Sequence, residues 1–151
     1  TERTDFCIGV AGYPEKHFEA PNLNTDLYYL EQKIANGADY IVTQMFFDNN
    51  AFFDFQNKCK ERNIHVPIIP GIKPITSKKQ LVSIPKHFFI NLPDVLVENI
   101  LKAKSDAEVK EIGIEWCIQQ CKELKAAGVP VLHFYTMGKS EETAKIAKAV
   151  W

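Results

Sequence analysis

Hydrophobic residues along the 151-residue chain gather in four short runs that are rich in β-branched and aromatic side chains. None of these runs alternates cleanly between apolar and polar positions, so each is typical of a strand buried on both faces. The runs span residues 6–11, 40–47, 67–72 and 131–136. Helical patterns fill the gaps between them. This alternation predicts an α/β fold of parallel strands joined by crossover helices.

The first helix is predicted over residues 23–36, where leucine and isoleucine recur at spacings of four, three and four. Asn22 or Asn24 can cap its start, and Gly37 suits the left-handed residue after its end. Further helices are predicted over residues 50–62, 78–84, from Pro93 onward, 106–127 and 141–150.

Four such units are half of a (β/α)₈ barrel, but an open, doubly wound sheet has the same pattern. No G-x-G-x-x-G fingerprint follows the first run, which disfavours a Rossmann domain. In both architectures the ligand site lies at the carboxyl ends of the strands.

Composition excludes several classes of partner. Eighteen basic residues oppose 19 acidic ones, so neither nucleic acid nor an anionic membrane is expected to bind. No apolar run reaches the ~18 residues of a membrane span, and the first residues lack a signal-peptide pattern. Cys117 and Cys121 lie one helical turn apart. They are interpreted as buried, reduced thiols of a cytoplasmic protein rather than as metal ligands.

Polar and aromatic residues follow each predicted strand. Because the carboxyl ends of parallel strands meet at one edge, these residues are candidates for a common site. They are Tyr13, Glu15, His17 and Glu19 after the first strand, Thr43, Gln44 and Asp48 at the second, Lys73 and Thr76 after the third, and Tyr135, Thr136 and Lys139 after the fourth.

Gln44 stands out because its primary amide lies inside the apolar stretch "IVTQMFF". A buried amide needs hydrogen-bond partners. A backbone group would satisfy it. The alternative is a ligand with paired donors and acceptors, such as a pterin, a flavin or nicotinamide.

Asp26, Tyr29 and Lys33 fall on one stripe of the first helix, about 10 Å from end to end. The stripe is either a solvated charged surface or a binding surface. In the second case Lys33 neutralises a pyrophosphate and Asp26 accepts hydrogen bonds from ribose hydroxyls. Tyr13 and His17 have similar alternatives, a rim aromatic and a solvated loop histidine.

Four motifs together resemble the methylenetetrahydrofolate reductase family: "AGYPEKHFEA", "ANGADYIVTQMFFD", "PIIPGIKPI" and "HFYTM". They occur in the family's order and spacing, and the resemblance runs from Phe6 to Trp151. It implies that residues 1–151 are a partial catalytic domain, strands five to eight of a (β/α)₈ barrel, with no second domain.

The resemblance implies an enzyme with non-covalent FAD. Such enzymes pass hydride from NADH or NADPH to the flavin, and then to 5,10-methylenetetrahydrofolate, in a ping-pong scheme. The positions that match FAD contacts of the family are Tyr13, His17, Ala20, Asp26, Tyr29, Gln32 and Lys33. Some bacterial members have Asn and Arg in place of Tyr29 and Gln32.

The positions that match substrate contacts are Gln44, Gln80 and Lys139. The resemblance implies that Gln44 meets the folate pterin and, in the other half-reaction, the nicotinamide. Lys139 replaces an Arg of some members, and Ile84 stands where some members have a Phe that packs on the bound substrate.

The family's general acid lies on the first strand of the barrel, outside this chain. The resemblance therefore implies no catalytic residue here and little activity for these residues alone. A half-barrel also leaves sheet edges exposed. We therefore expect it to be unstable alone, or to pair with the missing half-barrel or with a second copy as a homo-oligomer.

Two other functions remain open from the residues. One is a phosphate-binding (β/α)₈ lyase or isomerase that uses Gly138 at a helix N-terminus. The other is a non-catalytic fragment kept for interaction.

Overall fold

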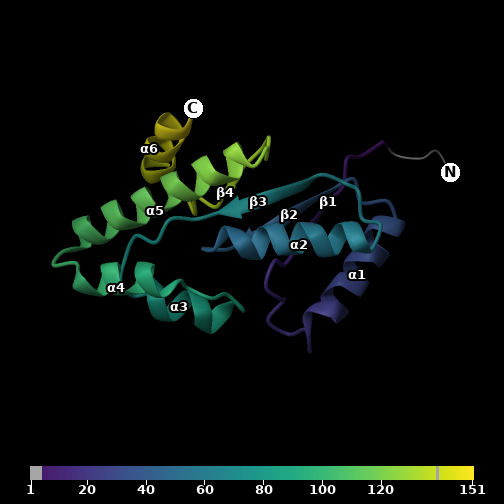
Figure 1. Ribbon diagram of the computed structural model, residues 1–151, viewed down its shortest axis with the longest axis horizontal. Helices are drawn as coiled ribbons and strands as arrows, with labels where there is room; N and C mark the ends of the chain where they lie inside the picture. The colour runs from purple at the N-terminus through teal and green to yellow at the C-terminus, as the bar shows by residue number, and fades with distance from the viewer. Residues whose placement is uncertain (1–4, 139) are drawn as a thin grey trace.

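Within the described residues the sheet has four parallel strands, and each strand after the first is hydrogen-bonded to the one that precedes it in the chain (Figure 1). The computed structural model describes residues 5–138 and 140–151. The strands are β1 (Gly9–Gly12), β2 (Tyr40–Met45), β3 (Ile68–Ile72) and β4 (His133–Phe134), in the order β1-β2-β3-β4. A doubly wound sheet reverses its order at a switch point. The sequential order observed here is that of a barrel segment, so the predicted parallel α/β architecture is confirmed.

The helices lie close to their predicted positions, and no predicted boundary is more than three residues away. Local capping explains this agreement. The Asn22 side chain accepts a hydrogen bond from the Thr25 amide at 2.9 Å, and Gly37 has a φ of +100° just after the helix. The helices are α1 (Leu23–Ala35), α2 (Asn49–Glu61), α3 (Gln80–His87), α4 (Asp94–Lys102), α5 (Asp106–Ala126) and α6 (Glu141–Val150).

Helices cover the outward face of the sheet. Ile41 of β2 packs between leucines of α1 and Phe55 of α2. Ile72 of β3 packs under α2, α5 and α6. Cys117 and Cys121 belong to this second cluster and are fully buried, which confirms the interpretation as buried thiols. A third cluster, with Met45 and Ile75, lies at the carboxyl end of the sheet beneath α3 and α4.

The prediction that all four strands are buried on both faces is wrong. In β2, buried residues alternate with half-buried ones, and in β1 Gly9 and Ala11 are exposed. The physical reason is that no second layer covers the inner face within the described residues, and β1 has a neighbouring strand on one side. The outer two strands are also shorter than predicted. Phe6 precedes β1 and is 74% exposed.

Glycines allow two close approaches that position the carboxyl end of the sheet. A Cβ on Gly113 of α5 would lie 1.8 Å from the carbonyl oxygen of Ile75, in the segment after β3. A Cβ on Gly71 of β3 would lie 2.2 Å from the carbonyl oxygen of Thr43. Only glycine fits at these two contacts, since real Cβ atoms do not approach other atoms so closely.

Among the described residues, no helix has the length and the apolar character that crossing a membrane requires.

Candidate functional site

Six of the seven residues predicted to bind FAD line one surface groove beside α1. The groove has a volume of about 490 Å³. We call it the α1 groove, and its lining residues are Tyr13, His17, Asp26, Tyr29, Gln32, Lys33 and Asn36. The two segments predicted separately, the loop after β1 and the polar stripe of α1, therefore form a single surface.

Tyr13 and His17 are in edge-to-face contact, with ring centroids 4.6 Å apart. The backbone N–H of Glu19 donates to Nδ1 of His17 at 3.2 Å, so Nε2 is the protonated nitrogen of the neutral ring. Burial, followed by the nearby Asp26 carboxylate, raises the pKa of Tyr13. Tyr13 therefore presents a neutral hydroxyl to the groove.

Asp26 ties the loop after β1 to the helix, because its Oδ2 accepts a hydrogen bond from the backbone N–H of His17. One carboxylate oxygen thus has a structural role, and the second can still accept from a ligand. Lys33 lies in the last turn of the same helix. The groove therefore combines a carboxylate, a cation and the exposed ring of Tyr29.

Ala20, the seventh predicted residue, does not line the groove. Its backbone shapes the loop instead. The Ala20 N–H donates to the His17 carbonyl at 3.1 Å, and its carbonyl accepts from Nζ of Lys16 at 2.6 Å. No sequence pattern indicated this role of Lys16, whose side chain also lies over the ring of Phe89, 4.3 Å from its centroid.

Gln44 and Gln80 line a second cavity, of about 540 Å³, at the carboxyl ends of β2, β3 and β4. We call it the strand-end pocket. Its lining residues are Gln44, Met45, Lys73, Gln80, Ser83, Ile84, His87, Phe88, Tyr135 and Met137. Two of the three predicted substrate residues therefore meet in space. The third, Lys139, lies outside the described residues.

Gln44 is half-buried, and its Oε1 accepts a hydrogen bond from the Met45 backbone N–H at 3.0 Å. The backbone partner foreseen as one alternative is therefore present for the oxygen. Among the described residues, Nε2 of Gln44 donates no hydrogen bond. The amide thus keeps two donor positions for a ligand.

An irregularity in β2 fixes the orientation of this amide. The register against β3 shifts between Val42 and Met45, and such bulges re-aim side chains. The Thr43 hydroxyl accepts from the Gly71 N–H at 2.9 Å, and the Thr43 carbonyl accepts from the Tyr135 hydroxyl at 2.9 Å. Tyr135 therefore clamps the residue directly before Gln44.

Gln80 has a structural hydrogen bond as well. Its Oε1 accepts from the backbone N–H groups of Thr76 at 2.6 Å and Ser77 at 3.2 Å. The side chain thus holds the turn that begins α3 while it lines the pocket. Ile84 also lines the pocket, at the position where the family resemblance implies a change from Phe.

The two cavities lie at the same end of the sheet. Burial raises the pKa of Tyr135, and the nearby phenol of Tyr13 adds to this rise. Tyr13 belongs to the α1 groove and Tyr135 to the strand-end pocket. A ligand that reaches along this edge of the sheet can therefore contact both.

None of the described residues that line the strand-end pocket is a carboxylic acid. Over residues 5–138 and 140–151, no group of three His, Cys, Asp or Glu side chains is arranged to hold a metal ion.

Comparison with protein families gives a match over nearly the whole chain. A family model described as methylenetetrahydrofolate reductase matches residues 1–150. Methylenetetrahydrofolate reductase 1 of Schizosaccharomyces pombe is 38% identical over 134 residues, which are 88% of this chain and 22% of that protein. The 5,10-methylenetetrahydrofolate reductase of Escherichia coli is 35% identical over 141 residues, 93% of this chain and 48% of that protein.

The chain thus spans between about a fifth and about a half of the length of such relatives. Among solved structures, an uncharacterized protein from Clostridium thermocellum that binds two copies of 5-methyl-5,6,7,8-tetrahydrofolic acid has a TM-score of 0.59 and 23% identity. The match covers 96% of this chain and 53% of that one. This similarity supports the fold.

Proposed function

The chain belongs to the methylenetetrahydrofolate reductase family, and we propose that it is the second half of a flavin-dependent barrel. The complete enzyme would reduce 5,10-methylenetetrahydrofolate to 5-methyltetrahydrofolate with NADH or NADPH in the cytoplasm. Relatives named for each dinucleotide exist: the Caenorhabditis elegans protein carries NADPH in its name, and an Arabidopsis thaliana protein carries NADH.

The observation that carries the proposal is the α1 groove. Its residues come from two segments, the loop after β1 and the polar stripe of α1. The donor set fits the adenosine diphosphate part of FAD. A cation suits the pyrophosphate, a carboxylate suits ribose hydroxyls, and an exposed aromatic ring suits adenine stacking.

In this proposal Lys33 neutralises phosphate charge and Asp26 accepts from a ribose hydroxyl with the oxygen that does not hold the loop. Tyr13 and His17 form the wall between the groove and the end of β1. When bound, FAD supplies the hydride chemistry, and the protein supplies orientation and electrostatics.

The strand-end pocket serves the two substrates in turn. The Nε2 group of Gln44 donates to the pterin in one half-reaction and to the nicotinamide carboxamide in the other. Gln80 and Lys139 contact the folate. The structural neighbour that binds a methylated tetrahydrofolate supports a folate as ligand of such a fold. The general acid comes from the other half of the barrel.

The test is FAD affinity in the full-length protein that contains this segment. Lys33→Ala is expected to weaken FAD binding about tenfold, because a charge-assisted phosphate contact contributes about 1.5 kcal/mol. Lys148→Ala is a matched control, since Lys148 is an exposed lysine in the last turn of α6. It should leave the affinity unchanged.

Asp26→Ala should weaken FAD binding as well, through both the lost ribose contact and the released loop. If the full-length protein binds no flavin, or if neither groove variant changes its affinity, the proposal is wrong.

A further inference from the structure

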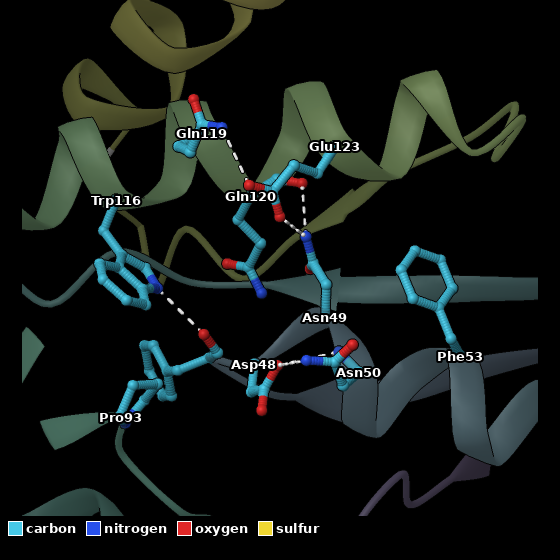
Figure 2. Close-up of a pocket in the computed structure, with 10 residues that line it drawn as sticks. Asp48, Asn49, Asn50, Phe53, Pro93, Trp116, Gln119, Gln120 and Glu123 are labelled. Carbon is cyan, nitrogen blue, oxygen red and sulfur yellow. Dashed lines mark hydrogen bonds between the residues drawn. The ribbon is translucent and has the colours of Figure 1, made fainter. Parts of the chain in front are cut away.

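A third cavity lies between α2 and α5 and shares no lining residue with the α1 groove or the strand-end pocket. We call it the α2–α5 pocket. It has a volume of about 380 Å³, and its lining residues are Phe47, Asp48, Asn49, Asn50, Phe53, Pro93, Trp116, Gln119, Gln120 and Glu123 (Figure 2). This volume is within the range of small-molecule sites.

The polar side chains that line the pocket are acidic or neutral. Its polar side chains are carboxylates and primary amides, and the described lining residues include no Lys, Arg or His. The remaining wall is apolar and largely aromatic. The Trp116 ring is held in place because its indole N–H donates to the Phe47 carbonyl at 3.0 Å.

Gln120 leaves an acceptor without a partner. The side chain is 4% exposed, and its Nε2 donates to the Phe46 carbonyl at 2.9 Å. The reversed amide would set two oxygens against each other, so the orientation is fixed. Oε1 of Gln120 then has no hydrogen-bond partner among the described residues. Figure 2 shows the amide between Trp116 and Asn49, with its oxygen on the Trp116 side.

Asn49 is a second buried amide whose nitrogen is hydrogen-bonded. It is 8% exposed, and its Nδ2 donates to the Gln120 carbonyl at 3.1 Å and to Oε2 of Glu123 at 2.9 Å (Figure 2). Both partners are acceptors, so this amide cannot reverse either. Oδ1 of Asn49 has no partner among the described residues. Two buried acceptors in one wall are costly unless a donor reaches them.

The carboxylates of the pocket indicate which kind of hydrogen-bond donor would bind there. Glu123 accepts hydrogen bonds from the amides of Asn49 and Gln119, and Asp48 accepts from Asn50. Within the part of the chain that the structure describes, neither carboxylate has an ion pair. Two negative charges beside an aromatic wall favour a ligand that is both a donor and a cation.

We propose that the α2–α5 pocket binds a small organic cation through a guanidinium or primary ammonium group. The carboxylate of Glu123 pairs with the charge, and the amide oxygens of Asn49 and Gln120 accept its N–H groups after local adjustment of the pocket wall. The face of Trp116 covers the alkyl part. This site is independent of the flavin and of the proposed reaction.

The test is titration calorimetry of the full-length protein with agmatine, which carries both a guanidinium and an ammonium group. We expect saturable binding at one site per chain. Butylurea, a neutral analogue with similar donors, should bind at least tenfold more weakly. Glu123→Gln should weaken agmatine binding about tenfold. Glu123 is exposed, so this variant is expected to fold.

Glu115→Gln is the matched control, because Glu115 is an exposed carboxylate of the same helix outside the pocket. It should bind agmatine like the unmodified protein. Absence of agmatine binding, equal binding of butylurea, or equal effects of the two variants would overturn the proposal. FAD affinity should be unchanged in both variants, so this test succeeds or fails separately from that of the reductase function.

Discussion

β1 and β3 belong to the same sheet, but they differ in what surrounds them. β3 has a strand on each side and three helices over its outward face, and its last three residues are buried. Among the described residues, β1 pairs with β2 alone, and two of its four residues are exposed. The exposed side chains of Phe6 and Ile8 precede it. Such an apolar strand edge is what a missing neighbour would cover.

The two candidate sites lie on these two different parts of the sheet. The α1 groove is built from residues 13–36, on the edge side of the molecule. The strand-end pocket is built from residues 44–137, over β3 and its neighbours. The first site is therefore local in sequence and has few packed neighbours, whereas the second is distributed along the chain and lies over the packed part of the sheet.

The largest expected effect is that of Gly113→Ala on the packed side. The new Cβ would meet the Ile75 carbonyl oxygen at 1.8 Å, so the helix and the segment after β3 must separate. We expect a loss of about 3 kcal/mol in the free energy of unfolding, although alanine is the better helix former. Urea denaturation of the full-length protein measures it.

Gly37→Ala on the edge side is the matched control. No atom of the part of the chain that the structure describes lies within 4 Å of a Cβ at Gly37, and its φ of +100° is the source of strain. The expected cost is about 1 kcal/mol. Equal costs at the two glycines would show that the two sides do not differ in packing.

The next effect is that of Gln44→Ala on the proposed reaction. Loss of the two Nε2 donors should slow folate-dependent reoxidation of the flavin about 30-fold, which corresponds to about 2 kcal/mol. FAD affinity should stay within twofold, because Gln44 does not line the α1 groove. Stopped-flow spectroscopy measures the half-reaction.

Lys33→Ala should show the reverse pattern, weaker FAD binding with a normal folate half-reaction in the flavin-saturated protein. If Gln44→Ala mainly affects FAD binding, the division into two sites is wrong.

The smallest effect is that of Tyr135→Phe. The variant loses the hydrogen bond to the Thr43 carbonyl, which should cost about 1 kcal/mol of stability and a few-fold in the folate half-reaction. Tyr28→Phe is the control, because Tyr28 is 52% exposed on α1. It should have almost no effect in denaturation. A loss of FAD affinity on Tyr135→Phe, with a normal folate half-reaction, would contradict the proposed role of Tyr135 in positioning Gln44 for the folate.

Local features explain what the sequence could predict. Helix boundaries follow from caps such as Asn22 and from glycines just past the helix end, so these elements lie near their predicted positions. Strand lengths depend on neighbours. Residues 6–8 have strand-like side chains, but strand pairing begins at Gly9. The prediction that the strands are buried on both faces is wrong for the same reason. Burial of the inner face requires a second layer of structure, and the hydrophobic pattern of a strand does not show whether that layer is present.

In the candidate sites, too, features local in sequence could be predicted, whereas contacts between distant residues could not. The stripe of Asp26, Tyr29 and Lys33 was visible from helical spacing, and the structure places all three residues in one groove. The meeting of Asn49 and Gln120 could not be predicted, because the two residues are far apart in sequence and ordinary amides in composition. The hydrogen bond from Tyr135 to Thr43 links the residue just after β4 to β2, and it could not be predicted for the same reason.

The hydrogen bonds from α5 to the carbonyls of Phe46 and Phe47 have a consequence for motion. They fasten the main chain just beyond Gln44 to the buried face of a long helix, so this stretch is held in place. In the proposed reaction two different molecules visit the same amide one after the other. Gln44 therefore keeps one position during their exchange, so the same amide can orient each molecule in turn.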